Sequence, residues 1–378
     1  MIEYVEIRSA DNRELVGIID TAKSVIWHSM YYGVGDFEIY APCTAETAAY
    51  LLAGNYVTRA DSDEVGIIEK IDVTYNPQDG RMIIASGRFA KSILDRRVIY
   101  TLSGNSVSPS RFKGNVETAV RGLVADNAIS CAFDSGRNIS ELVLGAAAGL
   151  SKVIVDENGN ASSKQVTYNN LLEYTDSLLQ EYEYSALCQL DNNLKLSYVI
   201  FEGKDRSVDN TAGNEPVIFS QDFDNLLSSE YVYDSSPLKN TALIGGAGEG
   251  TDRFCTVIKN SNITGISRRE LFVDASSSSR TYTDADGATQ TFSNADYEST
   301  LKTQGRQSVS SAIVIENLSA EIDLTNSPMK YGKNADYYLG DIVTAHDVEI
   351  SMYINPRIIE VTEVQDENGY TIAAVFGQ

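Results

Sequence analysis

The end of the chain constrains its fold most strongly. Residues 336–344 combine aromatic and β-branched residues as strands do, and Gly340 interrupts them where a bend or bulge is expected. Residues 356–364 and 370–376 are two further strand-like runs, and a turn containing a glycine separates them. The pattern predicts a bent strand followed by a β-hairpin, and a bend of this kind is what a barrel corner needs.

Strand-like segments also dominate the first part of the chain. Turns rich in glycine, asparagine and aspartate separate them. Two short helices are expected there, one at 45–53 between a Thr44 cap and a Gly54 stop, the other at 87–94. The expected strands are 1–7, 15–19, 24–31, 36–41, 65–75 and 81–86.

The periodicity changes after Asn115. From Val116 to Val124 apolar residues recur at helical spacing, behind an asparagine that can cap the first turn. A strand at 151–155, a turn at 156–159 and a second helix at 168–182 follow. With the hairpin strands 184–190 and 194–201, this segment is interpreted as an α+β insertion between two β-rich blocks.

The rest of the chain returns to strands and loops. Strands are expected at 215–220, 241–245, 253–259, 269–273 and 319–324, with one helix at 295–302. A β-block followed by an α/β-block therefore occurs twice, which indicates two related halves. Because 378 residues are long for one core, we expect about two or three compact domains.

The charge balance limits the possible partners. The chain has 53 acids and 30 bases, a formal net charge of −23, which disfavours a nucleic-acid grip that depends on neutralising phosphates. The excess can serve solubility, or it can let DNA slide past an acidic surface. We expect a soluble protein without a membrane span or a secretory signal, because no apolar run is long enough and the start of the chain is acidic.

Motifs for catalysis, cofactors and metals are weak. The 4 cysteines have no paired spacing, so we expect free thiols in a reducing cytoplasm. The glycine-rich residues 246–250 lack the lysine and hydroxyl residue of a phosphate loop and predict a hairpin turn. Residues 284–287 begin like a calcium loop, but Ala295 stands where the bidentate glutamate is due, which favours a solvated turn.

The chain has only 2 histidines, His28 and His346, and both lie in strand-like surroundings. We expect them to be packed or surface residues rather than members of a catalytic triad. With no carboxylate pair singled out either, the sequence predicts no catalytic, cofactor-binding or metal-binding residue, no cofactor and no enzyme activity. The charge clusters 204–206 and 268–270 can lock domains or subunits together, or they can be solvated turns.

Several short motifs occur in an order and spacing that resemble one protein family. The sequence is similar to the siphophage tail hub proteins, which form the N-terminal hub part of tail-associated lysins and are similar to the central baseplate hub of contractile tails. The matching motifs are SVIW at 24–27, GDFE at 35–38, GR at 87–88, LDRRVI at 94–99, GKDRS at 203–207, VIFS at 217–220, RRELFVD at 268–274 and YLGDIV at 338–343.

The resemblance implies a mainly β fold with two tail-tube-like β-barrel domains, each with an α/β insertion, that assembles as a trimeric ring. The first barrel would comprise residues 1–110, completed by strands from 194–224, with the insertion at 111–193. The second would comprise 225–264 and 325–378, with a small insertion at 265–324.

The function implied by the resemblance is that of a structural adaptor in the virion tail tip or baseplate, made in the host bacterial cytoplasm. The homotrimer would join a hexameric tail tube or distal tail protein to a three-fold spike or fibre. It would also meet the tape measure protein, and genomic DNA would pass through without specific binding. We predict an acidic channel lining, because basic residues would hold the DNA.

Two alternatives stay open at this point. One is a cell-wall-degrading enzyme of the tail tip that uses paired carboxylates. The other is a receptor-binding baseplate module, for which 22 tyrosines supply aromatic residues.

Overall fold

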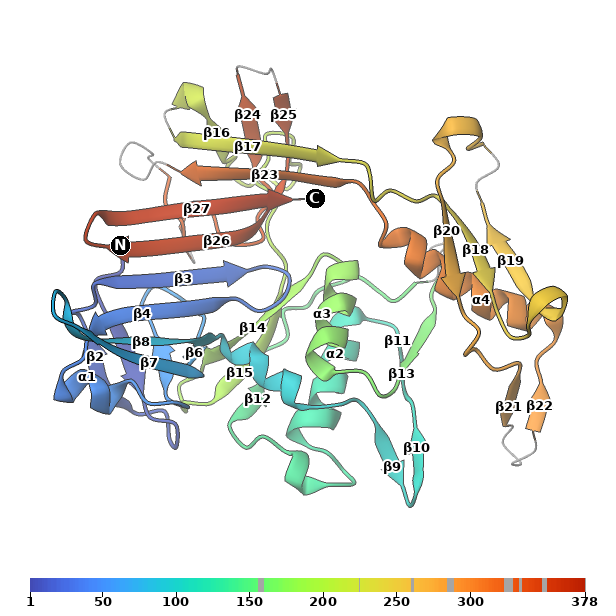
Figure 1. The fold of residues 1–378 in the computed structure, drawn as a ribbon, viewed down its shortest axis with the longest axis horizontal. Coiled ribbons are helices and arrows are strands. Elements are labelled where there is room, and N and C mark those ends of the chain that lie inside the picture. The colour runs from blue at the N-terminus through green and yellow to red at the C-terminus, as the bar shows by residue number, and fades with distance from the viewer. Residues whose placement is uncertain are drawn as a thin grey trace. The chain divides into compact units, whose positions relative to one another are not determined.

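The computed structural model describes residues 1–155, 160–223, 225–259, 262–283, 289–322, 329–332, 335–348 and 352–377. The chain packs as two compact units, which Figure 1 shows as a ribbon. Unit 1 consists of Met1–Glu230 with Leu318–Gln378, and unit 2 of Tyr231–Asn317. The expected turn at 156–159 and the calcium-like residues 284–287 lie outside the described residues.

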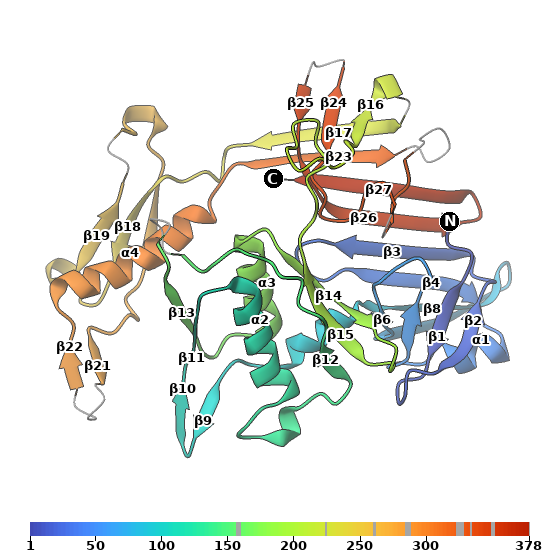
Figure 2. The ribbon, with the colours of Figure 1, turned by 180° about the vertical axis from the view of Figure 1, so that it is seen from behind.

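An eight-stranded sheet has the order β17-β23-β27-β26-β3-β4-β8-β7, and all of it except the last residues of β17 and the first residues of β23 belongs to unit 1. The two ends of the chain meet in its middle, where β26 pairs antiparallel with β3, and Figures 1 and 2 show these strands side by side. The predicted terminal hairpin is confirmed as β26 and β27. The strands are β3 (Ser24–Met30), β4 (Asp36–Pro42), β7 (Lys70–Asn76), β8 (Gly80–Arg88), β17 (Leu226–Asp234), β23 (Ile315–Ile322), β26 (Arg357–Asp366) and β27 (Gly369–Gly377).

One face of this sheet packs on a second, four-stranded sheet. Alternate residues of β3, β4 and β8 point into the shared core, among them the fully buried Trp27, Phe37 and Ala85. Each fully buried large apolar side chain contributes about 1.5–3 kcal/mol to such a core. The second sheet has the order β2-β1-β5-β6, with β1 (Val5–Arg8), β2 (Leu15–Ile19), β5 (Tyr56–Thr58) and β6 (Gly66–Ile67).

The predicted α+β insertion has two helices whose first turns are capped by asparagines. The side chain of Asn115 accepts a hydrogen bond from Thr118 N at the start of α2 (Val116–Val124), and Asn170 does the same for α3 (Leu171–Glu181). These helices pack on a sheet of β12 (Leu142–Leu144), β14 (Ser185–Leu190) and β15 (Leu196–Phe201) in one apolar core. Two strand pairs complete the segment: β9 (Thr101–Ser103) with β10 (Ser106–Ser108), and β11 (Ser110–Lys113) with β13 (Ser163–Val166).

Unit 2 is a small α/β module. Its three-stranded sheet has the order β19-β18-β20, with β18 (Thr241–Gly245), β19 (Cys255–Ile258) and β20 (Glu270–Asp274). Helix α4 (Asn294–Ser310) covers one face, where Tyr297 and Leu301 pack on Ile244. A separate hairpin pairs β21 (Thr281–Thr283) with β22 (Thr289–Thr291).

The remaining elements are short. A small sheet of unit 1 contains β16 (Ile218–Ser220), β24 (Thr344–Asp347) and β25 (Met352–Ile354), and helix α1 (Ala45–Tyr50) begins at the Thr44 cap. A π-helical turn, Ala125–Ile129, extends α2. The 3₁₀ turns are Ala90–Arg96, Ser135–Arg137, Gln221–Phe223, Gly250–Asp252 and Gly265–Ser267.

Several expected elements are wrong or differ in extent. Residues 336–343 form turns and isolated bridges instead of a strand, because Gly340 has a φ of 90° and Asp341 bonds other segments, so β24 begins only at Thr344. Residues 151–155 make isolated bridges rather than a strand. The expected helix at 87–94 is wrong at its start, since β8 runs to Arg88, and α1 ends before Gly54.

The mainly β character and the two α/β segments agree with the expected fold class. In the part of the chain that the structure describes, no sheet closes into a barrel, so the two barrel domains and their boundaries stay predictions. Among the same residues, no helix has both the length and the apolar character that crossing a bilayer requires.

Candidate functional site

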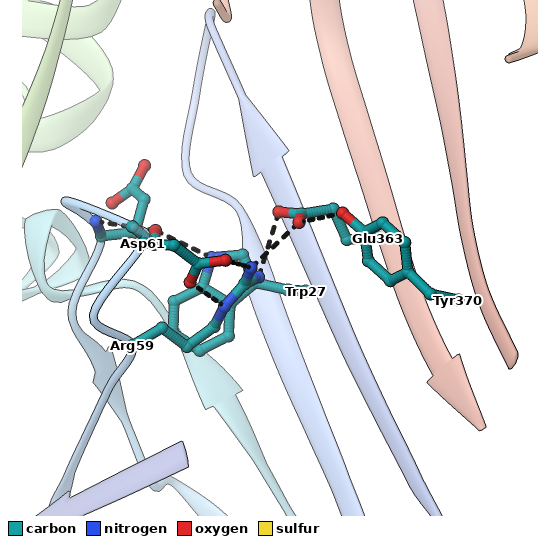
Figure 3. Close-up of polar contacts among 7 residues, drawn as sticks. Trp27, Arg59, Asp61, Glu363 and Tyr370 are labelled. Atoms are coloured by element: carbon teal, nitrogen blue, oxygen red, sulfur yellow. Dashed lines mark hydrogen bonds and ion pairs between the residues drawn. The ribbon is translucent and has the colours of Figure 1, made fainter. Parts of the chain in front are cut away.

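A buried charge cluster ties the C-terminal hairpin to the N-terminal half of unit 1. The Arg59 guanidinium, with a side chain only 1% exposed, donates to both carboxylate oxygens of Glu363 at 2.9 and 3.0 Å. It also donates to both oxygens of Asp61 at 2.8 and 2.9 Å. Tyr370 donates its hydroxyl to Glu363 at 2.5 Å, and the ring of Trp27 lies 5.2 Å from the guanidinium carbon (Figure 3).

The fold positions each partner in this cluster. Arg59 follows the end of β5, and Glu363 lies opposite Trp27 on the core-facing side of β26. Burial alone would lower the pKa of Arg59, but the bonds to Glu363 and Asp61 outweigh burial and raise it. Burial and the charge of Glu363 both raise the pKa of Tyr370, so the tyrosine stays a donor. The cluster is a buried ion-pair lock between β26 and the segment that follows β5.

A second lock uses the charge cluster 204–206, which the sequence singled out. The buried Asp341 accepts hydrogen bonds from Lys204 N at 2.7 Å, from Arg206 Nε at 2.9 Å and from Tyr338 N at 3.0 Å. A Cβ on Gly203 would lie 1.8 Å from the carbonyl oxygen of Gly340, so the two backbones approach as only glycines allow. The cluster therefore locks two segments of one chain together.

The second predicted charge cluster is more exposed. Arg268 and Glu270 form an ion pair of 2.5 Å whose side chains are 33% and 61% exposed, and Arg269 donates to the carbonyl of Ser235. Pairs at this exposure contribute little to stability. This cluster is therefore closer to a solvent-exposed turn than the cluster at 204–206.

A hollow of about 300 Å³ lies beside the first lock. The lining residues include Glu6, Arg8, Thr58, Asp63, Glu64 and Gln189. Arg8 is paired with Glu6 at 2.6 Å and donates to Thr58 at 3.0 Å. Burial raises the pKa of Glu64 to about 7; the positive charge of Lys91 opposes this rise, and the negative charge of Asp63 adds to it. Glu64 is therefore the carboxyl group most altered by its surroundings in this region.

The face of the large sheet that points away from the core is acidic. Strand register places Asp36 opposite Arg88, and Glu38 and Lys70 opposite Ser86, all on this face. On the other side of the β3–β26 pairing, the register places Glu360 and Asp366 there as well. On this face of β3, β4, β7, β8 and the part of β26 from Glu360 to Asp366, the acids are Asp36, Glu38, Asp72, Glu360 and Asp366, and the bases are Lys70 and Arg88.

The histidines, the glycine-rich turn and the cysteines singled out in the sequence lie in packed or surface positions. His28 lies on the acidic face, 3.5 Å from Asp36 and 3.4 Å from Glu360, and the ring of His346 packs beside Tyr353. Residues 246–250 connect the antiparallel strands β18 and β19, so the predicted hairpin turn is confirmed. The cysteines at 43, 131, 188 and 255 are free thiols. No group of acids, histidines or cysteines able to hold a metal ion occurs among the residues that the structure describes.

The sequence did not identify Arg59, Glu363 or Glu64. One signal was available: Glu363 follows Val361 at the inward positions of a predicted strand, where an acid requires a buried partner. The partner lies 304 positions away and could not be named from spacing.

Comparisons with known proteins agree with this architecture. The family described as Siphovirus ReqiPepy6 Gp37-like protein matches residues 4–378, whereas no curated protein matches the chain. The 43 kDa tail protein of prophage MuSo2 from Shewanella oneidensis has a similar fold, with a TM-score of 0.56, 13% identity, and coverage of 100% of this chain and 98% of that chain. A tail protein from Neisseria meningitidis MC58 has a TM-score of 0.54 at 13% identity, over 99% of this chain and 96% of that chain.

The resemblance to siphophage tail proteins is therefore confirmed along nearly the whole length, and both similar structures show that the fold occurs in tail proteins. The chain belongs to the Siphovirus ReqiPepy6 Gp37-like protein family.

Proposed function

We propose that this protein is a structural hub of a phage tail or phage-tail-like particle. As a homotrimer it joins a hexameric tail tube to a three-fold tip and surrounds the DNA channel. The observation that carries this proposal is the open eight-stranded sheet with an acidic outer face. Membership of a siphovirus family supports its location in a virion.

The sheet consists of two sets of four strands. The first half of the chain supplies β7, β8, β4 and β3, and the second half supplies β17, β23, β27 and β26. Three copies would present six such sets, which matches the symmetry of a hexameric tube while keeping three-fold symmetry for a spike or fibre. Both edge strands, β7 and β17, carry exposed apolar residues, among them Val73, Tyr75, Val232 and Tyr233. Edges of this kind favour pairing with another chain.

The acidic face fits a channel that releases DNA. Lysine and arginine on such a face would bind phosphates with release of counterions, and the DNA would be held. A face on which Asp36, Glu38 and Glu360 outnumber the bases repels the duplex instead. We therefore assign the outward face of the sheet to the channel lining.

The partners follow from this role. They are the tail tube or distal tail protein, the spike or fibre, and the tape measure protein. The two tail-tube-like barrels with their insertions would be completed in the assembled ring, where neighbouring edges meet. Host cytoplasm is the place of synthesis in this proposal.

Mass measurement against concentration tests the proposal. Light scattering and native mass spectrometry should show monomers giving way to trimers, and a Val73→Lys variant should stay monomeric because lysine blocks the β7 edge. Leu243→Lys, an equally apolar exposed site on β18 of unit 2, is the matched control and should still form trimers. A stable dimer or tetramer at every concentration, or a neutral or basic lining in an electron microscopy map of the ring, would contradict the proposal.

One observation favours an enzyme as second candidate. Glu64, with its pKa raised to about 7, lines an open hollow together with Asp63, as the general acid of a glycosidase would. A zymogram on cell walls separates the two functions, because a hub leaves the walls intact. The receptor-binding alternative stays a prediction that a glycan array can test.

A further inference from the structure

Glu64 has an unusual environment for a carboxyl group. The residue is 8% exposed, it lines the hollow beside the Arg59 lock, and its Oε2 atom has no hydrogen-bond partner among the described residues. A buried charge-bearing oxygen without a donor costs several kcal/mol. The chain therefore holds an acceptor that its own side chains leave unused.

The bases around the hollow do not fill this role. Arg8 is engaged by Glu6 and Thr58, and Arg59 by Asp61 and Glu363. Lys91, which lies close enough to act on the charge of Glu64, forms its ion pair with Asp176 at 3.0 Å. None of these three bases therefore donates to Oε2 of Glu64.

We propose that this hollow binds the guanidinium or ammonium group of a basic side chain presented by another protein, with Glu64 as the carboxylate partner. A volume of about 300 Å³ accommodates such a group with part of its alkyl stem. Thr58, Ser62 and Gln189 supply further polar atoms in the lining. The inference does not depend on the hub role, since it rests on the geometry of the free chain.

A cation fits better than the other ligand classes. An anion would meet Asp63 and Glu64 in the wall of the hollow, within a chain of net charge −23. A metal ion would need a set of ligands, and no such set occurs in the described part of the chain. A guanidinium or ammonium group supplies both the charge and the N–H donors that Oε2 lacks.

Binding should depend on pH through Glu64. The charged and titratable groups that surround it are Lys91, Asp63, Asp176, Arg59, Cys188, Tyr331 and Tyr338. Burial raises the pKa of Glu64 to about 7, so the carboxylate form falls from about nine-tenths at pH 8 to about one-tenth at pH 6. Affinity for a cation should therefore fall about tenfold over this range.

Calorimetric titration with ethylguanidinium tests the site. The wild-type chain should bind at pH 8, lose about tenfold affinity at pH 6, and release protons at pH 7, seen as a heat that changes with the ionisation enthalpy of the buffer. Glu64→Gln should lose both the binding and the pH dependence. Glu367→Gln, in the exposed β26–β27 turn, is the matched control and should behave as wild type. Tetramethylammonium, a cation without N–H donors, should not bind.

Two further titrations distinguish a cation on a protein side chain from a free small cation. A tripeptide with a central arginine and capped ends should bind with the same dependence on Glu64. Binding of spermidine but not of the tripeptide would overturn the assignment to a protein side chain. Equal ethylguanidinium binding by Glu64→Gln and wild type, or equal binding of tetramethylammonium and ethylguanidinium, would overturn the site itself. Proton release by the wild type provides a test that does not require any variant to fold.

Discussion

Removing either partner of the buried Arg59–Glu363 pair should destabilise the protein, but by different amounts. Arg59→Met would leave the carboxylate of Glu363, 8% exposed, with Tyr370 as its remaining donor, so an uncompensated charge would stay buried. Breaking a buried pair in this way costs about 3–5 kcal/mol of unfolding free energy. Glu363→Leu would leave Arg59 paired with the half-exposed Asp61, so only the charge-assisted bonds to Glu363 are lost, at about 1.5–3 kcal/mol. We expect Arg59→Met to be the more damaging change.

The double variant separates this reasoning from simple loss of packing. Arg59→Met combined with Glu363→Leu removes both buried charges and replaces them by apolar side chains of similar size. Such replacements are often nearly neutral, so the double variant should be more stable than the sum of the single costs implies, by about 2 kcal/mol or more.

The protein contains its own probe for this measurement. Trp27 is the only tryptophan, it is fully buried, and its ring lies against the Arg59 guanidinium. Urea unfolding followed by its fluorescence therefore reports on unit 1 without a signal from unit 2, which matters because two units need not unfold together. Asp72→Asn, which removes an exposed pair with Lys70, is the control and should match wild type. Equal costs for the two single variants, or strictly additive costs, would refute the reasoning.

Three further outcomes follow from the structure. Between pH 4.5 and pH 7, Glu64 binds more protons in the folded than in the unfolded chain, because burial raises its pKa from 4.5 to about 7. The resulting loss of stability is absent below pH 4.5 and grows as the pH rises. Above pH 7 the loss is complete and amounts to about 3 kcal/mol. Urea midpoints at pH 5 and pH 8 should therefore show Glu64→Gln gaining on wild type only at the higher pH, and a constant difference would contradict this. Gly203→Ala should destabilise the protein by several kcal/mol, because the added Cβ would meet a backbone oxygen. Gly122→Ala in α2, where nothing lies within 4 Å, should instead stabilise it by about 0.5–1 kcal/mol. Equal melting temperatures for the two variants would contradict the close approach of the two backbones. Thiol titration should find that the exposed Cys255 reacts in the native protein. The buried Cys188, whose pKa is raised by burial, should react only after denaturation. The denatured protein should show 4 reactive thiols, and a count of two or fewer would disprove free thiols.

Local patterns were enough to predict elements that carry their own signals. Helices α2 and α3 have asparagine caps and apolar stripes, and the terminal hairpin has a glycine turn between alternating runs. Each of these elements can be predicted from a window of about 15 residues.

Elements decided by distant partners could not be predicted in this way. Residues 336–344 have the composition of a strand, but Asp341 bonds Lys204 and Arg206, and Ile342 N donates to Lys204 O. Their backbone groups are thus used by a segment more than a hundred positions earlier, which no periodicity reveals. The same holds for Arg59 and Glu363, whose pairing depends on the register of β26 against β3.

The pairing of β3 with β26 makes the two ends of the chain depend on each other. A chain that contained only the first predicted block, residues 1–110, would expose one edge of β3 in the middle of the large sheet and leave Arg59 without Glu363. Closing a loop of more than three hundred residues costs only about (3/2)RT ln n, which grows slowly with length, so the gain from the central strand pair and the buried ion pair can exceed it. The sheet that we assign to the channel is therefore completed only when the last strands have been made.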